Sequence, residues 1–327
     1  MKKTALITGI NGQDGSYLTQ LLLSQDYNVY GLIRRHSVAE HQTFRLDDTK
    51  FDIENNLVYG DLTDFSSLQR LIKKIKPDVI YNLGAQSHVR VSFDAPIYTT
   101  ETIVSGTLNI LECIRLSESP IKFYQASSSE MFGNNIDSDG FQRESTPMKP
   151  VSPYGAAKLC AYHNVQVYRK SYNIFACNGI LFNHESPFRG VNFVTNKIVR
   201  GAMMIKKGIS NELVLGNLDA SRDWGHAKDY VKAMLLIMEL DRPDDYVCST
   251  GETHTVQELC DYVFKKLELS KDHIKTGKQF MRPNELNILK GDSSKLRKAT
   301  NWSPEYTFHS MIDEMLEYWD SKLDHKK

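Results

Sequence analysis

The sequence predicts an α/β protein: a Rossmann-type, doubly wound parallel sheet with a smaller C-terminal substrate-binding lobe. Three observations support this fold class. Short apolar segments alternate with longer segments of helical period through the first half of the 327 residues, which is typical of crossover units around a parallel sheet. A glycine-rich turn follows the first apolar segment, where a strand would lead into a helix. The second half is less regular and places polar loops between helical segments.

Each element of the first half follows from its own pattern of residues. Runs of β-branched, aromatic and aliphatic residues predict strands over 4–8, 28–33, 56–59, 79–83, 122–126 and 175–181. Apolar residues that recur at helical spacing predict helices over 16–24, 66–75, about 96–116 and 153–172. The last helix has the clearest start, because Ser152 is a favoured N-cap residue and Pro153 is favoured at the first helical position.

Four more helices are predicted in the second half, separated by turn-rich segments. The helices are expected over 193–205, 228–240, 256–267 and 308–323, and the polar or turn-rich segments over 183–192, 208–211 and 216–223. We therefore expect a first domain of residues 1–183, to which part of about 216–241 returns. Residues 184–327 are expected to form mainly the smaller lobe.

The charge balance excludes two large classes of partner. The chain has 40 Lys and Arg against 40 Asp and Glu, so its formal net charge is 40 − 40 = 0. Proteins that bind nucleic acid or an anionic membrane surface usually carry a strong basic excess. We therefore expect neither kind of partner.

The cysteines and the apolar runs favour a cytoplasmic protein without a bound metal. Five cysteines are scattered without a CxxC spacing, and His88, His184 and His226 have no His or Cys at coordinating spacing. The N-terminal segment resembles the start of a signal peptide, but Gly9 and the polar residues after it end the apolar run too early. The longest later apolar run is far too short to span a membrane.

A glycine-rich turn predicts a dinucleotide site. Residues 9–15 have the pattern GxxGxxG and stand between the first expected strand and the first expected helix. Glycines allow a tight turn and a close approach of the backbone to a pyrophosphate, and the helix N-terminus offers N–H groups and a positive dipole end. The alternative is a tight turn with a structural role only. The candidate cofactor residues of this turn are Gly9, Asn11, Gly12, Gln13, Asp14 and Gly15.

Two arginines after the second expected strand favour NADP over NAD. An NAD site usually has an acidic residue here, which accepts from the ribose 2′-hydroxyl, but this strand leads into Arg34 and Arg35. Two guanidinium groups suit the additional 2′-phosphate of NADP. The alternative is a solvated basic loop. Further cofactor contacts are expected after the third and fourth strands, at Asp61, Leu62, Leu83, Ala85 and Ser87. These segments could equally be ordinary loops.

Tyr154 and Lys158 form a candidate acid–base pair. They stand four residues apart in the helix expected over 153–172, so their side chains lie one turn apart on one face. A free tyrosine has a pKa of about 10 and is a poor base at neutral pH. A nearby ammonium group favours the phenolate, so we expect Lys158 to bring the pKa of Tyr154 into the working range of a general acid or base.

Together these motifs resemble the extended short-chain dehydrogenase/reductase family, and within it the chain is most similar to the GDP-mannose 4,6-dehydratase family. The matching stretches are 5–9, 12–18, 34–35, 81–89, 123–127, 177–187 and 222–231. The resemblance implies a lyase of nucleotide-sugar metabolism that keeps NADP bound and removes water from a GDP-sugar. Hydride would leave the sugar at C4 and return at C6.

The resemblance implies roles for four catalytic residues. Tyr154, supported by Lys158, would exchange a proton with the sugar O4. Ser128, where family members carry threonine, would orient the sugar hydroxyl. Glu130 would remove the C5 proton, a step that separates a dehydratase from a reductase or an epimerase. Without the resemblance, a glutamate after a strand would more often be a solvated loop charge.

Binding residues in both halves are also implied by the resemblance. On the substrate side they are Ser87, Ser128, Glu130, Asn183, Lys197, Arg222 and Arg282, and on the cofactor side they include Tyr98, Tyr154, Lys158, His184 and Arg189. The loop at His36 and Ser37 resembles the loop through which family members form tetramers, so a homodimer or homotetramer is expected. Two alternatives stay open: another GDP-sugar, such as a GDP-heptose or another GDP-hexose, and epimerase or 4-reductase chemistry.

Overall fold

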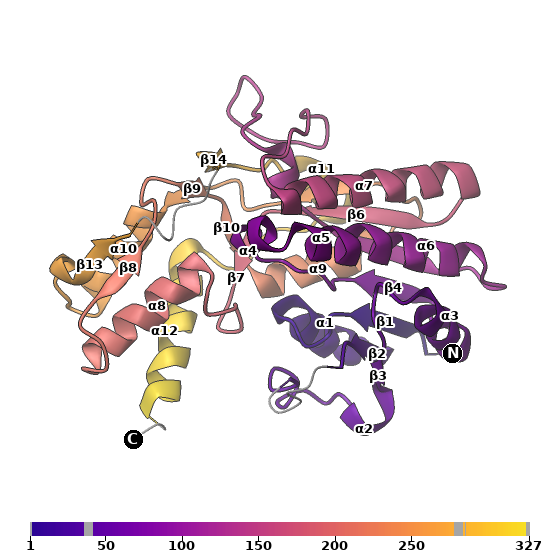
Figure 1. Ribbon diagram of the computed structural model, residues 1–327, viewed down its shortest axis with the longest axis horizontal. Coiled ribbons are helices and arrows are strands. Elements are labelled where there is room, and N and C mark those ends of the chain that lie inside the picture. The colour runs from indigo at the N-terminus through magenta and orange to yellow at the C-terminus, as the bar shows by residue number, and fades with distance from the viewer. Residues whose placement is uncertain (1, 36–41, 278–283, 285, 325–327) are drawn as a thin grey trace.

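A seven-stranded, fully parallel sheet forms the centre of the protein, in a computed structural model that describes residues 2–35, 42–277, 284 and 286–324 (Figure 1). The strand order is β11-β6-β5-β4-β1-β2-β3, the arrangement of a doubly wound sheet. The strands are β1 (Thr4–Thr8), β2 (Asn28–Ile33), β3 (Leu57–Tyr59), β4 (Val79–Asn82), β5 (Lys122–Ser128), β6 (Ala176–Leu181) and β11 (Asp245–Cys248). The predicted fold class is confirmed.

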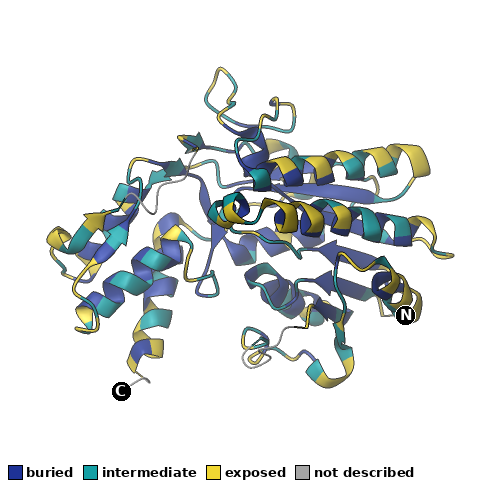
Figure 2. Ribbon diagram, viewed as in Figure 1, coloured by how far each residue is buried: buried dark blue, intermediate teal, exposed yellow. Residues whose placement is uncertain are grey.

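Helices cover both faces of this sheet because each presents an apolar side to it. One face packs against α1 (Gln13–Ser24) and α9 (Ala227–Glu239), and the other against α3 (Phe65–Ile75), α6 (Gly106–Arg115) and α7 (Pro153–Tyr172). Figure 2 shows the strands in the colour of buried residues and exposed residues along the outer sides of the helices. Burial of the sheet on both faces explains why its strands read as apolar runs.

A smaller lobe packs around its own core beside the sheet. Its helices are α8 (Val194–Lys206), α10 (Val256–Lys266) and α12 (Phe308–Asp324), and their apolar sides form one cluster with the parallel pair β8 (Leu213–Leu215) and β13 (Ile274–Thr276). Figure 1 places this lobe at one end of the molecule, with the C-terminus below it and the N-terminus at the opposite end.

Short strands connect the sheet to the lobe. β7 (Asn183–Glu185) pairs with β10 (Trp224–His226), while β9 (Ser221–Arg222) pairs with β12 (His254–Thr255) and with β14 (Ile288–Leu289). The remaining elements are α2 (Ile53–Asn56), α4 (Val89–Asp94), α5 (Pro96–Thr100), the π-helical turn η1 (Glu101–Ser105), the 3₁₀ turns η2 (Ser129–Phe132) and η3 (Lys271–His273), and α11 (Ser294–Thr300).

Local signals place the helix ends well. The N-cap Ser152 accepts a hydrogen bond from the Gly155 N–H at 3.0 Å, and Asn173 in the left-handed conformation follows the last residue of α7, so this helix has its predicted bounds. Thr255 and Glu258 form a reciprocal capping box at the start of α10. Among the helices of the described ranges, none is both long and apolar enough to cross a membrane.

Several predicted bounds differ from the structure. The helix expected over 96–116 is divided into α5, η1 and α6, and β5 continues to Ser128, two residues beyond the predicted end. Residues 183–192, predicted as a polar loop, begin with β7. Strand β11 was not predicted; it lies outside the segment of about 216–241 that was expected to return. The segment opens with two acidic residues, Asp244 and Asp245, instead of an apolar run, and β11 forms through its parallel pairing with β6.

Candidate active site

The glycine turn after β1 has the geometry that its sequence predicts. Gly9 has φ +68°, a conformation that glycine adopts without strain. A Cβ atom on Gly15 would lie 2.5 Å from the Gly9 carbonyl oxygen, so only glycine allows α1 to begin this close to the turn. No side chain caps the N-terminus of α1 at Gly12, and a helix leaves its first N–H groups without partners inside the helix. These groups stand at the edge of a cavity.

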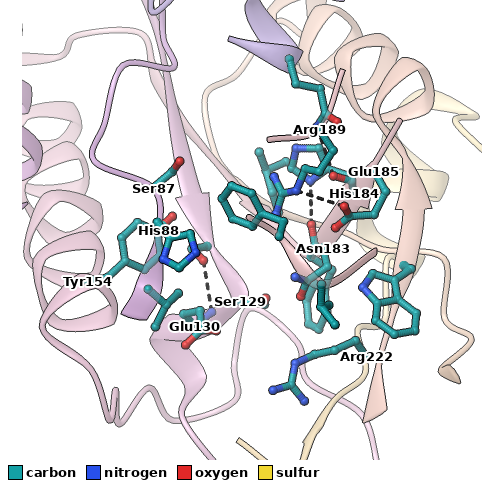
Figure 3. Close-up of a pocket in the computed structure, with 18 of the residues that line it drawn as sticks. Ser87, His88, Ser129, Glu130, Tyr154, Asn183, His184, Glu185, Arg189 and Arg222 are labelled. Atoms are coloured by element: carbon teal, nitrogen blue, oxygen red, sulfur yellow. Dashed lines mark hydrogen bonds and ion pairs between the residues drawn. The ribbon is translucent and has the colours of Figure 1, made fainter. Parts of the chain in front are cut away.

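This cavity, of about 380 Å³, lies at the carboxyl ends of the central strands and extends to the lobe. In Figure 3, Ser87, His88, Glu130 and Tyr154 face Asn183, His184, Arg189 and Arg222 across it. The predicted site residues that line it are Gly9, Gly12, Gln13, Asp14, Gly15, Leu83, Ala85, Ser87, Ser128, Glu130, Tyr154, Lys158, Asn183, His184, Arg189, Lys197 and Arg222. Open α/β sheets bind their ligands at this edge.

Other predicted site residues lie outside the cavity lining. They are Asn11, Arg34, Arg35, Asp61, Leu62 and Tyr98. The exposed Arg34 guanidinium lies 5.5 Å from the centre of the Tyr98 ring, so two residues predicted separately for the cofactor are neighbours. The Asp61 carboxylate accepts from the N–H and the hydroxyl of Thr63. Arg282, and the loop at His36 and Ser37, lie outside the described residues.

Three candidate catalytic side chains meet at the start of α7. Ser128 ends β5, and its hydroxyl accepts from the Glu130 N–H at 3.2 Å and also contacts the Tyr154 hydroxyl. Of the neighbouring serines, Ser127 donates instead to Asn178 inside the sheet, at 3.0 Å. Ser128 is therefore the serine that the fold places between the tyrosine and the glutamate. Both of those side chains are buried in the cavity wall.

The electrostatics of Tyr154 differ from the prediction. Burial raises its pKa to about 12, the hydrogen bond with Ser128 lowers it, and the charge of Glu130 raises it. The spacing of Tyr154 and Lys158 predicted a shift toward neutral pH, and that direction is wrong for the protein without its ligands. The physical reason is that desolvation of the phenolate outweighs the favourable contacts around it.

Lys158 is buried beside the tyrosine, and its ammonium group is hydrogen-bonded to the backbone. Its Nζ donates to the Ala126 carbonyl oxygen at 2.7 Å and lies 5.7 Å from the centre of the Tyr154 ring. Burial lowers the pKa of Lys158 to about 8, although the charge of Asp14 opposes that shift. At neutral pH most molecules therefore still carry the ammonium charge within reach of Tyr154.

The glycine turn is linked to the segment after β6 by side-chain contacts. Asp14 Oδ2 lies 2.8 Å from Nε2 of His184, and Ser186 donates to Gln13 at 2.7 Å. Burial alone would raise the pKa of the Asp14 carboxyl and lower that of the His184 ring. The ion pair outweighs it, so the pKa of Asp14 is lowered and that of His184 is raised.

Some cavity residues were not predicted as site residues. Glu185 is 2% exposed and forms an ion pair with Arg189, whose guanidinium stacks on the ring of Phe193. The Phe193 ring also contacts the His88 ring, with 5.1 Å between their centres, so residues from the two halves touch across the cavity. Glu185 directly follows His184 in the sequence, but the sequence alone does not reveal that its side chain is buried.

The substrate-side candidates stand on the lobe side of the cavity. Asn183 begins β7, Lys197 projects from the first turn of α8, and Arg222 ends β9 with 6% of its surface exposed. Burial lowers the pKa of Lys197. Lys197 and Arg222 line the same cavity, and two cations in one cavity wall suit a diphosphate. Across the described ranges, no three His, Cys, Asp or Glu side chains form a group that could hold a metal ion.

A family model and individual related proteins point to the same family. A family model described as GDP-mannose 4,6 dehydratase matches residues 6–315. GDP-mannose 4,6 dehydratase 1 from Arabidopsis thaliana is 49% identical and covers 97% of this chain and 89% of its own length. GDP-mannose 4,6 dehydratase from Cricetulus griseus is 46% identical and covers 97% of this chain and 91% of its own length.

Solved structures show the same fold at lower identity. The dTDP-glucose 4,6-dehydratase of Bacillus anthracis, in complex with NAD, superposes with a TM-score of 0.83 at 21% identity and covers 98% of both chains. RMD from Pseudomonas aeruginosa, complexed with NADPH, has a TM-score of 0.81 at 23% identity and covers 98% of this chain and 100% of its own. The fold alone thus does not separate NAD from NADP.

Proposed function

The chain belongs to the GDP-mannose 4,6-dehydratase family and is a hydro-lyase of that type, and we propose that it converts GDP-mannose to GDP-4-keto-6-deoxymannose with NADP as its resident cofactor. The observation that carries the residue assignment is the meeting of Ser128, Glu130 and Tyr154 in one cavity, next to the glycine turn. An oxidation followed by an elimination requires two proton-transferring groups, and Tyr154 and the carboxylate of Glu130 are such groups.

The residues around the turn suit a dinucleotide. Gly12 stands in the cavity wall, where a Cβ atom would meet only the Gly9 carbonyl oxygen, at 3.2 Å, so the backbone is open to a ligand. The uncapped N-terminus of α1 suits its pyrophosphate. The bound cofactor would supply a hydride acceptor for C4 of the sugar and a hydride donor for C6, so it is restored in each turnover.

Arginines at the end of β2 support NADP in particular. Arg34 and Arg35 are exposed there, and both guanidinium groups lie near tyrosine rings, those of Tyr98 and Tyr59. The end of β2 lies beside the glycine turn, because the Gly9 N–H donates to the Leu32 carbonyl oxygen at 3.1 Å. This position supports a contact of the two arginines with the 2′-phosphate of the adenosine. Charge-assisted bonds from a planar guanidinium suit that phosphate.

The catalytic residues divide the proton transfers between them. Tyr154 takes the proton from the sugar O4, and Lys158 supplies the positive charge that stabilises the phenolate. The hydroxyl of Ser128 forms a hydrogen bond with the O4 hydroxyl and so orients it. Glu130 then removes the C5 proton, which the new 4-keto group has made acidic, and passes a proton to the departing C6 hydroxyl. Tyr154 then gives the proton that it took from O4 to C5, and this completes the proton balance.

Substrate binding falls mainly to the lobe. We propose that Lys197 and Arg222 hold the diphosphate, with Asn183 and Ser87 close to the sugar. Arg282 keeps its proposed substrate contact, although it lies outside the described residues. In this proposal, residues 1–183 form the dinucleotide-binding domain together with part of about 216–241. The other residues of 184–327 bind mainly the GDP-sugar.

The proposal includes a homodimer or homotetramer in the cytoplasm. Exposed apolar side chains on two neighbouring helices support a surface for a second copy: Ile97 of α5 is 73% exposed and Val167 of α7 is 52% exposed. The cysteines at 113, 160, 177, 248 and 260 are all free thiols, as in a reducing compartment. Light scattering of the purified protein measures the oligomer directly.

The experiment that tests the function is incubation of the purified protein with GDP-mannose, followed by the mass of the product. A dehydratase yields a product lighter by one water without net use of NADPH, whereas a 4-reductase consumes NADPH and an epimerase leaves the mass unchanged. In Glu130→Gln the C5 proton stays in place, so no 4-keto-6-deoxy product should form. The control is Glu101→Gln, which removes an exposed charge on η1 and should leave turnover unchanged. Product from Glu130→Gln at the wild-type rate contradicts the role of Glu130.

A further inference from the structure

His184 is placed so that both of its ring nitrogens face hydrogen-bond acceptors. Nδ1 lies 2.7 Å from the carbonyl oxygen of Phe182, and Nε2 lies 2.8 Å from Oδ2 of Asp14. A carbonyl oxygen only accepts, so Nδ1 carries a proton. An ionised carboxylate also only accepts, so Nε2 carries the second proton and the ring is an imidazolium cation.

The groups packed around His184 act on its charge in both directions. The ring is stacked on Tyr230 of α9, with 4.5 Å between the ring centres, and the face of an aromatic ring attracts a cation. Asp14, from α1, favours the charged ring, whereas burial and the charge of Arg189 oppose it. Glu185, beside it on β7, is paired with Arg189. Together these effects raise the pKa of His184 above its ordinary value.

A second buried histidine in the same protein shows the opposite pattern. His226 also lies beside a carboxylate, with Nε2 at 2.8 Å from Glu314. Its Nδ1, however, accepts a hydrogen bond from the Lys228 N–H at 3.0 Å, so that nitrogen carries no proton. His226 is therefore neutral by geometry, and it provides an internal comparison for His184.

We propose that His184 is a protonated positioning residue that neutralises Asp14 inside the dinucleotide turn and joins that turn to β7; the link to the cofactor rests on the proposed function. Asp14 lines the cavity in the first turn of α1, where its unpaired carboxylate would repel the diphosphate of a dinucleotide. The imidazolium cancels that charge. The contact between Gln13 and Ser186 adds a second link between the same two segments.

The charge of this pair also concerns the catalytic residues. The carboxylate of Asp14 raises the pKa of Lys158 and that of Tyr154. Without the cation of His184 beside it, Asp14 would act on both groups more strongly, and phenolate formation at Tyr154 would become less favourable. The positioning residue thus influences the acid–base pair through Asp14, without touching the sugar.

The protonation state can be measured without any cofactor. In protein labelled with ¹⁵N-histidine, the two ring nitrogens of His184 should both show the shifts of protonated nitrogen at about pH 7, while those of His226 show one protonated and one bare nitrogen. The variants His184→Asn and His226→Asn identify the two sets of signals. A neutral His184 at this pH overturns the proposal. Because the product assay is not involved, this result is independent of whether the proposed function holds.

The effect on the turn can be measured by NADPH affinity, using the fluorescence of the bound nucleotide. His184→Gln should weaken NADPH binding about tenfold, because the carboxylate of Asp14 is left without its cation. Adding Asp14→Asn should restore most of the affinity, and His226→Gln should leave it unchanged. A double variant that binds NADPH no better than His184→Gln overturns the proposal. If His184→Gln does not fold, the ¹⁵N measurement on the wild-type protein still decides.

Discussion

Replacement of Lys158 by methionine should stabilise the folded protein while removing its activity. Lys158 is 4% exposed, and burial lowers its pKa from 10.5 to about 8. At about 1.4 kcal/mol per pKa unit, this fall means that the buried ammonium costs about 3 kcal/mol. Loss of the 2.7 Å hydrogen bond to the Ala126 carbonyl oxygen lowers the free energy of unfolding of the variant by about 1 kcal/mol. The net gain in the free energy of unfolding should be about 2 kcal/mol.

The gain should depend on pH in one direction only. Because the pKa of Lys158 is lower in the folded state, the penalty of the charged form is fully present below about pH 8. It disappears as the pH rises toward 10.5, where the amine loses its proton in both states. The stability advantage of Lys158→Met should therefore be largest at neutral pH and shrink progressively in alkaline buffer.

Urea unfolding followed by tryptophan fluorescence measures the difference, at equal protein concentration because an oligomer's stability depends on it. Lys170→Met, an exposed position on the same helix, is the matched control and should change stability by less than about 0.5 kcal/mol. Turnover of Lys158→Met should fall at least about 100-fold, the usual scale for loss of acid–base support. A less stable Lys158→Met variant, or a gain that does not change with pH, would refute the reasoning.

Two further predictions concern the cofactor site. Arg34→Ala combined with Arg35→Ala should weaken NADP binding about 10–100-fold through the loss of charge-assisted bonds, and equal losses for NAD in a fluorescence titration would contradict a 2′-phosphate contact. Gly15→Ala should cost about 1–3 kcal/mol, because its Cβ atom would lie 2.5 Å from the Gly9 carbonyl oxygen. In Gly12→Ala the new Cβ atom would lie 3.2 Å from the Gly9 carbonyl oxygen, so this variant should keep its melting temperature and lose cofactor affinity. Comparable destabilisation of Gly12→Ala and Gly15→Ala would show that the turn is not shaped as described.

Much of the site was predictable because its signals are local. The glycine turn and the start of α7 depend on residues within one or two turns of the chain, and both have the predicted geometry. The carboxyl ends of parallel strands meet at one edge, so Ser128 and Ser87 could be placed in one cavity from their positions after strands. Strand β11 escaped prediction because it begins with Asp245, and the buried partner of that carboxylate, Asn178, comes from the distant strand β6.

By itself, the sequence determined the fold class and the shape of the glycine turn, since these follow from hydrophobic period and glycine spacing. The resemblance to a known family added candidate site residues in both halves of the chain, and many of them line the cavity. Only the tertiary structure decided the charges. Desolvation reverses the shift expected for the pKa of Tyr154. Asp14 and His184 are 170 residues apart in the sequence and form one ion pair in space. A charge state depends on burial and on partners brought from distant segments, and those exist only after the chain has folded.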